Sequence, residues 1–380
     1  MSERPMVEMD IAARRARVQA LMRQRGIGVV IIYFGGQHYM LRMNQLMYLT
    51  DFKALGPAAL IMPLEGEPTL VLTPQWDLPR AKDECVGVAK IVSVSPGELA
   101  TAISLYTKTY RGAVALAGRE DLTVHAARAL YGALGAEPRD AETLVSSLAV
   151  ARTPIELARV AYAATIADAG FEALCARARV GMWEYELAAE VEAAMQALGS
   201  DDNYGLIGAG PHNQAIRAPT NRRLEKGDLI VGEITPCYRG YFAQLCRTYV
   251  LGEPSDLQRA KYDMLIAAQD AGFSVAYSGA PSSGIARAIN DVISAQGYGE
   301  YCRQPYMRTR GHGLGFGGVV PYDVTESASP VLETNMTMII HPNQYIPETG
   351  YMMLGDTVAI EPEGPRILTK TARRLFSGNA

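Results

Sequence analysis

The chain has 380 residues, of which 48% are hydrophobic and 20% are charged. This length suits two domains, and this composition is typical of a folded chain with a substantial core, which excludes a disordered or fibrous protein. Lys and Arg total 36 against 40 Asp and Glu, so the formal net charge of −4 does not favour nucleic acid as a partner. A small neutral or zwitterionic molecule fits better.

Cysteine content and hydropathy indicate where the chain works. Its five cysteines are an odd number without C-x-x-C spacing, which argues against a disulfide framework or a zinc ribbon and predicts a reducing, cytoplasmic setting. The first residues contain no apolar signal segment, and the longest apolar stretch, 27–34, is far too short to span a bilayer. We therefore expect neither export nor a membrane partner.

The first part of the chain alternates between helix-like and strand-like patterns. Apolar residues recur at helical spacing over 10–25, and a buried strand is predicted over 27–33 after the helix stop at Gly26. Helical stretches at 97–108 and 122–134 alternate with further strand-like runs, at 58–62, 69–72, 88–94 and 113–116. This order predicts an α/β domain over 1–145.

The second part, 152–380, opens with a strong helix start. Thr153 is placed as the N-cap, Pro154 as the first helical residue and Glu156 as the residue that returns the capping bond. A long helix and then a shorter one are predicted, followed by strand-like segments over 228–235 and 238–250. This unit is helix, helix, hairpin.

The same order then recurs. Ser255 opens another helix by the same capping logic, and the spacing 181–199 between two glycines equals the spacing 279–297 (199 − 181 = 297 − 279 = 18). We predict an internal αα-ββ duplication about a pseudo-twofold axis. This symmetry would place Glu233 and His341, which end matching strand segments, on equivalent strands over a shared cleft.

Three titratable side chains are candidates for chemistry. Glu233 interrupts an apolar strand, where a buried carboxylate needs a partner, and Gln244 is predicted to lie roughly opposite it across the hairpin. His312 lies in the glycine-dense segment RTRGHGLGFGG, and His341 ends an apolar strand. Two histidines and a carboxylate suit acid–base catalysis near neutral pH, although each histidine can also be a hydrogen-bonded core residue and Glu233 a solvated strand end.

These features resemble the pita-bread fold shared by creatinase, prolidase, aminopeptidase P and methionine aminopeptidase. The likeness rests on the α/β first domain, the duplicated second domain, GYFAQLCRTYVLGEP from Gly240 and GHGLG at 311–315. The resemblance implies an α/β N-terminal domain plus an α+β pita-bread C-terminal domain. It also implies a homodimer in which the first domain of one subunit closes the pocket of its neighbour.

The resemblance identifies the positions of metal ligands. Metallopeptidase members hold two divalent ions with two aspartates, one histidine and two glutamates, and here these positions are Glu233, Gln244, His312, His341 and Gly355. One remaining carboxylate cannot neutralise a pair of dications. We therefore expect no cofactor and a metal-independent, creatinase-like hydrolase outside the peptidases, or a lyase, that cleaves a C–N bond in a small nitrogen-containing metabolite.

In this hypothesis Glu233, His312 and His341 are catalytic, with one histidine as general base. Substrate contacts are expected from a second set of residues: Gln244, Arg308, Arg310, His212, Tyr238 and Phe52. Of these, an arginine would bind a substrate carboxylate, and Phe52 would reach the substrate across the dimer. Two alternatives remain open: a mononuclear metal-dependent hydrolase or lyase with the three catalytic candidates as ligands of one divalent ion, and a non-catalytic binding protein with a degenerate peptidase-like site.

Overall fold

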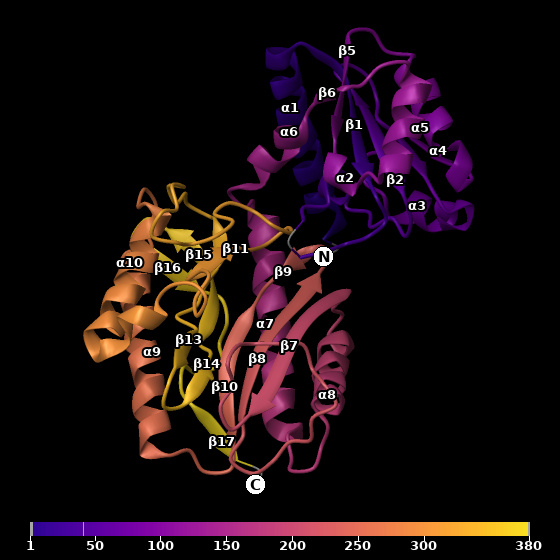
Figure 1. Ribbon diagram of the computed structural model, residues 1–380. Helices are drawn as coiled ribbons and strands as arrows, with labels where there is room; N and C mark the ends of the chain where they lie inside the picture. The colour runs from indigo at the N-terminus through magenta and orange to yellow at the C-terminus, as the bar shows by residue number, and fades with distance from the viewer. Residues whose placement is uncertain (1–2, 41, 379–380) are drawn as a thin grey trace. The chain divides into compact units, whose positions relative to one another are not determined.

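The structure is a computed structural model that describes residues 3–40 and 42–378 (Figure 1). The chain divides into two units, Met1–Val150 and Ala151–Ala380. In the part of the chain that is described, every helix is too short or too polar to cross a lipid bilayer.

The first unit is built on a six-stranded mixed sheet. Its strand order is β4-β3-β2-β1-β5-β6, in which β1 pairs antiparallel with β2 and parallel with β5. The strands are β1 (Ile27–Phe34), β2 (Ala58–Pro63), β3 (Thr69–Leu72), β4 (Lys90–Ser93), β5 (Ala113–Ala117) and β6 (Arg139–Asp140). The helices are α1 (Arg4–Arg25), α2 (Gln45–Thr50), α3 (Leu78–Glu84), α4 (Leu99–Thr107), α5 (Val124–Leu134) and α6 (Glu142–Ser146). Helix α1 ends where predicted, because Gly26 adopts the left-handed conformation at its C-cap.

The second unit is built on a nine-stranded sheet with the central path β11-β12-β15-β10-β8-β7. The strands on this path are β7 (Asp202–Gly210), β8 (Leu229–Tyr238), β10 (Leu245–Leu251), β11 (Gly311–Gly313), β12 (Thr337–Ile340) and β15 (Gly355–Glu361). The others are β9 (Tyr241–Phe242), β16 (Gly364–Ile367) and β17 (Phe376–Gly378), and a separate hairpin joins β13 (Gln344–Ile346) to β14 (Gly350–Met352). The helices are α7 (Pro154–Arg177), α8 (Glu184–Ala197), α9 (Asp256–Ser274) and α10 (Ser282–Ile293).

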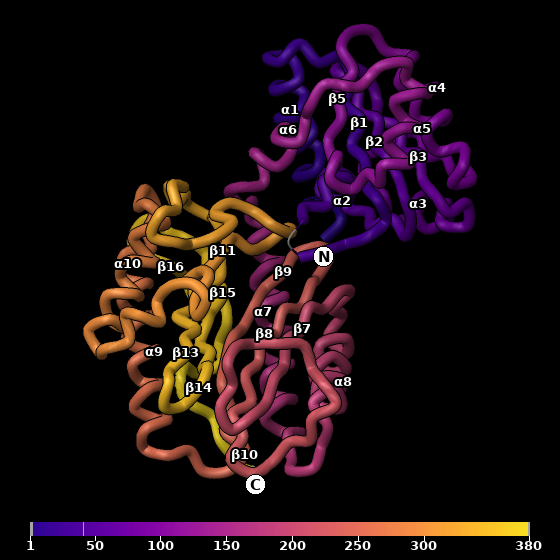
Figure 2. The backbone as a smooth tube through the Cα atoms, in the orientation of Figure 1, coloured from indigo at the N-terminus to yellow at the C-terminus, as the bar shows by residue number. Residues whose placement is uncertain are grey.

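The predicted duplication is present in the second unit. Counted inward from the two edges of the sheet, β7 corresponds to β11, β8 to β12, and β10 to β15. The two halves therefore meet where β10 pairs with β15. Each half begins with a helix pair, as the continuous trace in Figure 2 shows. The glycines at 181, 199, 279 and 297 all have positive φ, between 85° and 92°. Gly181 and Gly279 lie in the turns before α8 and α10, and Gly199 and Gly297 lie in the turns after them, so the equal spacing reflects matching turns in the two halves.

The predicted helix starts are confirmed at both α7 and α9. Thr153 Oγ1 accepts the amide of Glu156 at 3.4 Å, and the Glu156 carboxylate accepts the Thr153 amide at 2.8 Å. Ser255 and Gln258 exchange the equivalent bonds at 3.2 and 2.8 Å. These capping boxes satisfy amides that the first helical turn leaves without partners.

The register of the hairpin differs from the prediction. Glu233 lies opposite Cys246 rather than Gln244, because the strands are joined by a two-residue turn at Arg239 and Gly240, whose φ angles are 49° and 83°. Two successive positive φ angles make the tight turn that matches the twist of paired strands. Gln244 therefore lies just before β10.

Candidate functional site

The site is centred on Glu233, near the middle of β8. Its side chain is partly buried, and its Oε1 accepts a hydrogen bond from Gln244 Nε2 at 2.9 Å. The same Nε2 also donates to Thr235 Oγ1 at 3.1 Å, while Gln244 Oε1 is buried without a hydrogen-bond partner. The structure thus brings Glu233 and Gln244 together despite the shifted register, because the amide side chain reaches along the strand.

The two histidines face each other from the other half of the unit. His312 lies on the edge strand β11, and His341 directly follows the neighbouring strand β12. Their ring centroids are 5.9 Å apart at an interplanar angle of 67°, and both side chains are buried. Gly313 O lies 3.1 Å from His312 Nδ1, so this nitrogen carries the proton and Nε2 keeps its lone pair. His341 Nδ1 is buried without a hydrogen-bond partner.

Burial governs the electrostatics of this site. Loss of solvation raises the pKa of Glu233 to about 7, although the charge of Arg308 and the Gln244 hydrogen bond oppose that shift. Burial lowers the pKa of His341 to about 3, assisted by the neighbouring His312, and burial also lowers the pKa of His312. At neutral pH the imidazoles are uncharged and Glu233 is near its midpoint. The site is therefore short of positive charge around its one carboxylate.

The two arginine candidates occupy different environments. Arg308 is exposed and lies 3.3 Å from Asp323, and its charge acts on Glu233 and both histidines of the site. Arg310 is fully buried and donates to Asn290 Oδ1, Asn343 O and Gln344 Oε1 at 2.7 to 2.8 Å. Each side-chain nitrogen of Arg310 is therefore hydrogen-bonded within the fold, where Arg310 holds the loops around the site together, and its contact with a substrate carboxylate stays a prediction.

The remaining substrate-binding candidates each contact residues other than Glu233, His312 and His341. His212 is exposed, and its two ring nitrogens contact Pro347 O at 2.7 Å and Gln214 Nε2 at 3.0 Å. Tyr238, at the end of β8, packs on Tyr162 with ring centroids 4.5 Å apart. Phe52 is completely buried inside the first unit beneath the guanidinium of Arg80. Its buried ring offers no surface to a substrate, so the contact predicted for it is not supported.

Sequence reasoning missed the reason for Gly355. A Cβ at this position would lie 2.7 Å from His341 Cβ and 3.2 Å from Cys246 Sγ. Because Gly355 has no side chain, the His341 Cβ can pack directly against its backbone. A glutamate at position 355 would clash with His341 in its present position. A glycine at the first position of a strand was the available signal.

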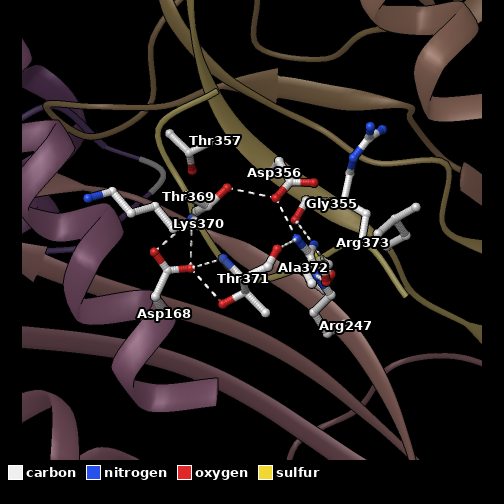
Figure 3. A network of polar contacts seen from close by, with 12 residues as sticks. Asp168, Arg247, Gly355, Asp356, Thr357, Thr369, Lys370, Thr371, Ala372 and Arg373 are labelled. Atoms are coloured by element: carbon white, nitrogen blue, oxygen red, sulfur yellow. Dashed lines mark hydrogen bonds and ion pairs between the residues drawn. The ribbon is translucent and has the colours of Figure 1, made fainter. Parts of the chain in front are cut away.

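The acid next to Gly355 does not replace the missing ligand. Asp356 Oδ1 accepts from Arg247 Nη2 at 2.6 Å and from Thr369 Oγ1 at 2.7 Å (Figure 3). Its Oδ2 accepts from Gln269 Nε2 at 2.9 Å. All four side chains are buried. This carboxylate is neutralised within the fold, which leaves Glu233 as the carboxylate of the five ligand positions.

The donor set fits one divalent ion and does not fit two. Two neutral imidazoles and one carboxylate are a common ligand set for a single transition-metal ion, and a ligating histidine usually donates its other nitrogen to a backbone carbonyl, as His312 does. His341 Nδ1 has no hydrogen-bond partner and the pKa of Glu233 is raised, and both features are expected of metal ligands in the absence of the ion. The ligand atoms of Glu233, His312 and His341 do not all lie within 4.8 Å of one another in this structure.

Comparison with known proteins assigns both units. The family model of metallopeptidase family M24 matches residues 158–362, and that of the creatinase/prolidase N-terminal domain matches residues 14–148. An Xaa-Pro dipeptidase of Pyrococcus furiosus is 30% identical over 243 residues, which are 62% of this chain and 67% of that protein.

Solved structures match over nearly the whole chain. The prolidase of Pyrococcus horikoshii has a TM-score of 0.82 at 23% identity and covers 96% of this chain and 99% of its own. The Xaa-Pro dipeptidase of Bacillus anthracis has a TM-score of 0.82 at 23% identity and covers 97% and 100%. These likenesses confirm the predicted fold class, an α/β N-terminal domain followed by a pita-bread C-terminal domain.

The comparisons also correct the predicted chemistry. A hydrolase of this fold is confirmed, but the metal-independent, creatinase-like hydrolase without a cofactor is wrong, because the matching family model describes metallopeptidases. The count of ligand carboxylates argued against a pair of dications, but it did not argue against a single metal ion. A single dication needs far less negative charge, and neutral imidazoles bind one without adding any.

Proposed function

Because the chain belongs to metallopeptidase family M24, we propose that it is a hydrolase of small amide substrates that holds one divalent metal ion on His312, His341 and Glu233. The observation that carries this proposal is the uncompensated carboxylate: burial raises the pKa of Glu233 to about 7, and burial also lowers the pKa values of His312 and His341. A cation at this point would keep Glu233 ionised and give His341 Nδ1 a partner.

The neighbouring groups have supporting roles. Gln244 holds Glu233 Oε1 and leaves Oε2 for the ion, while Gly313 O fixes the His312 tautomer. Arg308, exposed and electrostatically coupled to the site, is placed to attract a substrate carboxylate. A bound divalent ion supplies a Lewis acid for an amide carbonyl and lowers the pKa of a bound water.

The names of the relatives suggest the first substrates to test. Proteins similar to this chain are called Xaa-Pro dipeptidase and prolidase, so we propose dipeptides with proline at the second position as the substrate class. Their free carboxylate suits the positive charge of Arg308.

Hydrolysis of Xaa-Pro dipeptides by metal-free and reconstituted enzyme tests the proposal. We expect chelation to abolish turnover and one equivalent of Mn²⁺, Fe²⁺, Co²⁺ or Zn²⁺ to restore it. His312→Ala and His341→Ala should each lower kcat/KM by at least about 100-fold, while His125→Ala, at an exposed histidine of α5, should not. Full activity after exhaustive chelation would refute the requirement for a metal ion. Dipeptide binding without turnover, whichever of these metal ions is added, would favour the alternative of a non-catalytic binding protein.

Assembly and location complete the proposal. We propose a cytoplasmic homodimer: the resemblance implies the dimer, and the five cysteines, all free, suit a reducing compartment. Light scattering coupled to gel filtration tests the dimer, and a monomeric mass over a range of concentrations would contradict it.

A further inference from the structure

A cavity of about 530 Å³ opens in the second unit between α7 and the C-terminal strand β17, and none of the candidate site residues lines it. Its floor is aromatic: Phe171 and Phe376 meet edge to face with centroids 4.9 Å apart, and Tyr249 from β10 lies beside them. This volume lies in the range of small-molecule sites, and the aromatic floor suits an apolar group.

The wall of this cavity carries two basic and two acidic side chains, and the two acids differ in their hydrogen bonds. Lys370 and Arg374 are exposed, and the Arg374 guanidinium lies 4.7 Å from the Phe376 ring centroid. Of the two acids, Glu172 is exposed, whereas the Asp168 carboxylate keeps its charge but accepts hydrogen bonds from the backbone amides of Lys370 and Thr371 at 2.8 to 3.0 Å. The four charges of the wall therefore balance, but one acid is held by backbone amides, whereas the Lys370 and Arg374 side chains are exposed beside an apolar floor.

The same wall is linked by hydrogen bonds through Arg247 to the start of β15, next to the candidate site. Thr371 O and Ala372 O accept hydrogen bonds from Arg247 at 2.7 and 3.2 Å (Figure 3). The other donors of this buried guanidinium bind Gly355 O at 2.8 Å and the Asp356 carboxylate at 2.6 Å. Gly355 is the residue against which the His341 side chain packs. One rigid guanidinium thus joins the cavity wall, residues 369–374, to the start of β15.

We propose that this cavity is an effector site for a small carboxylate with an apolar body. The apolar body packs on Phe171, Tyr249 and Phe376, and the carboxylate pairs with Lys370 and Arg374. An occupied cavity holds 369–374 in the conformation that accepts Arg247, and so rigidifies the start of β15. This inference does not depend on the metal or on the reaction proposed above.

Calorimetric titration of the full-length protein with 3-phenylpropionate tests binding, with the neutral 3-phenylpropionamide as the matched ligand. We expect saturable binding of the carboxylate. Binding should weaken at least about tenfold for the amide and for the double variant Lys370→Ala/Arg374→Ala. It should also be blocked by Ala372→Trp, which fills the cavity from an exposed position. Arg308→Ala should bind as the unchanged protein does.

Hydrogen exchange tests the connection to the candidate site. The carboxylate should slow amide exchange in 369–374 and at the start of β15 in the unchanged protein, and in neither segment of the double variant. Equal affinity for 3-phenylpropionate and 3-phenylpropionamide would overturn the pairing of a carboxylate with Lys370 and Arg374. Binding that is lost in Arg308→Ala but kept in the double variant would show that the ligand binds outside this cavity. Protection confined to 369–374 would overturn the effector role.

Discussion

The chemistry of individual residues here depends on burial without a counter-charge. Glu233 lacks the positive partner that a buried carboxylate needs, and His341 is buried with one ring nitrogen unpartnered. Both residue types were identifiable from the sequence because each interrupts or ends an apolar strand. The engagement of Arg310 was not, since its three partners come from segments that only the fold brings together.

Replacing Glu233 by glutamine should stabilise the metal-free protein at neutral pH. A carboxyl group whose pKa rises from 4.5 to about 7 on folding keeps its proton in the folded state, so stability falls as pH rises from 4.5 through 7. Glu233→Gln removes that loss, which is at most about 3 kcal/mol. Urea unfolding in chelator at pH 5 and pH 8 measures it; an unchanged difference between the two proteins at both pH values would contradict this prediction.

Metal affinity should also depend on the ionisation of Glu233. Since the ligand is the carboxylate, affinity should rise by about tenfold per pH unit up to pH 7 and then level off. The pKa of His341, which burial lowers to about 3, leaves that ring deprotonated over this range, and burial shifts the pKa of His312 in the same direction. Titration with Co²⁺ from pH 5.5 to 8.5 measures the profile, and an affinity that stays constant over this range, or that still rises above pH 8, would contradict it.

At the level of single elements, locally encoded features were predictable and features set by neighbouring strands were not. The capping boxes of α7 and α9 lie within four residues, so the sequence shows them directly. The hairpin register depends on which two residues form the turn, and a shift of one residue in the turn changes every cross-strand partner. The space at Gly355 depends on β10 and on His341, which are remote in sequence.

Gly355→Ala should therefore disturb the site more than an ordinary strand substitution. The added Cβ would approach His341 Cβ to 2.7 Å, so we expect a loss of about 1–3 kcal/mol in the free energy of unfolding and weaker metal binding. Gly205→Ala, on β7 with no atom within 4 Å of the added Cβ, is the matched control. Equal stability and metal affinity for the two variants would show that Gly355 has no special role.

At the scale of the whole molecule, the repeated order of helices and strands made the pita-bread unit predictable. The pseudo-twofold order of the sheet places Glu233 and His341, 108 residues apart (341 − 233), on or next to the equivalent strands β8 and β12, as the proposed site requires. The chemistry was harder to predict, because a count of ligand charges cannot distinguish a site without a metal ion from a site with one. That distinction depends on ring orientation and burial, which the sequence does not encode locally.

The number of metal ions per chain tests the central claim most directly. Elemental analysis and native mass spectrometry of protein saturated with Zn²⁺ or Mn²⁺ and freed of excess metal should find one ion per chain, and Glu233→Gln and His341→Ala should retain much less. Anomalous diffraction should place that ion between His312 and His341. Two ions per chain, or none at saturating metal, would contradict a single-ion site.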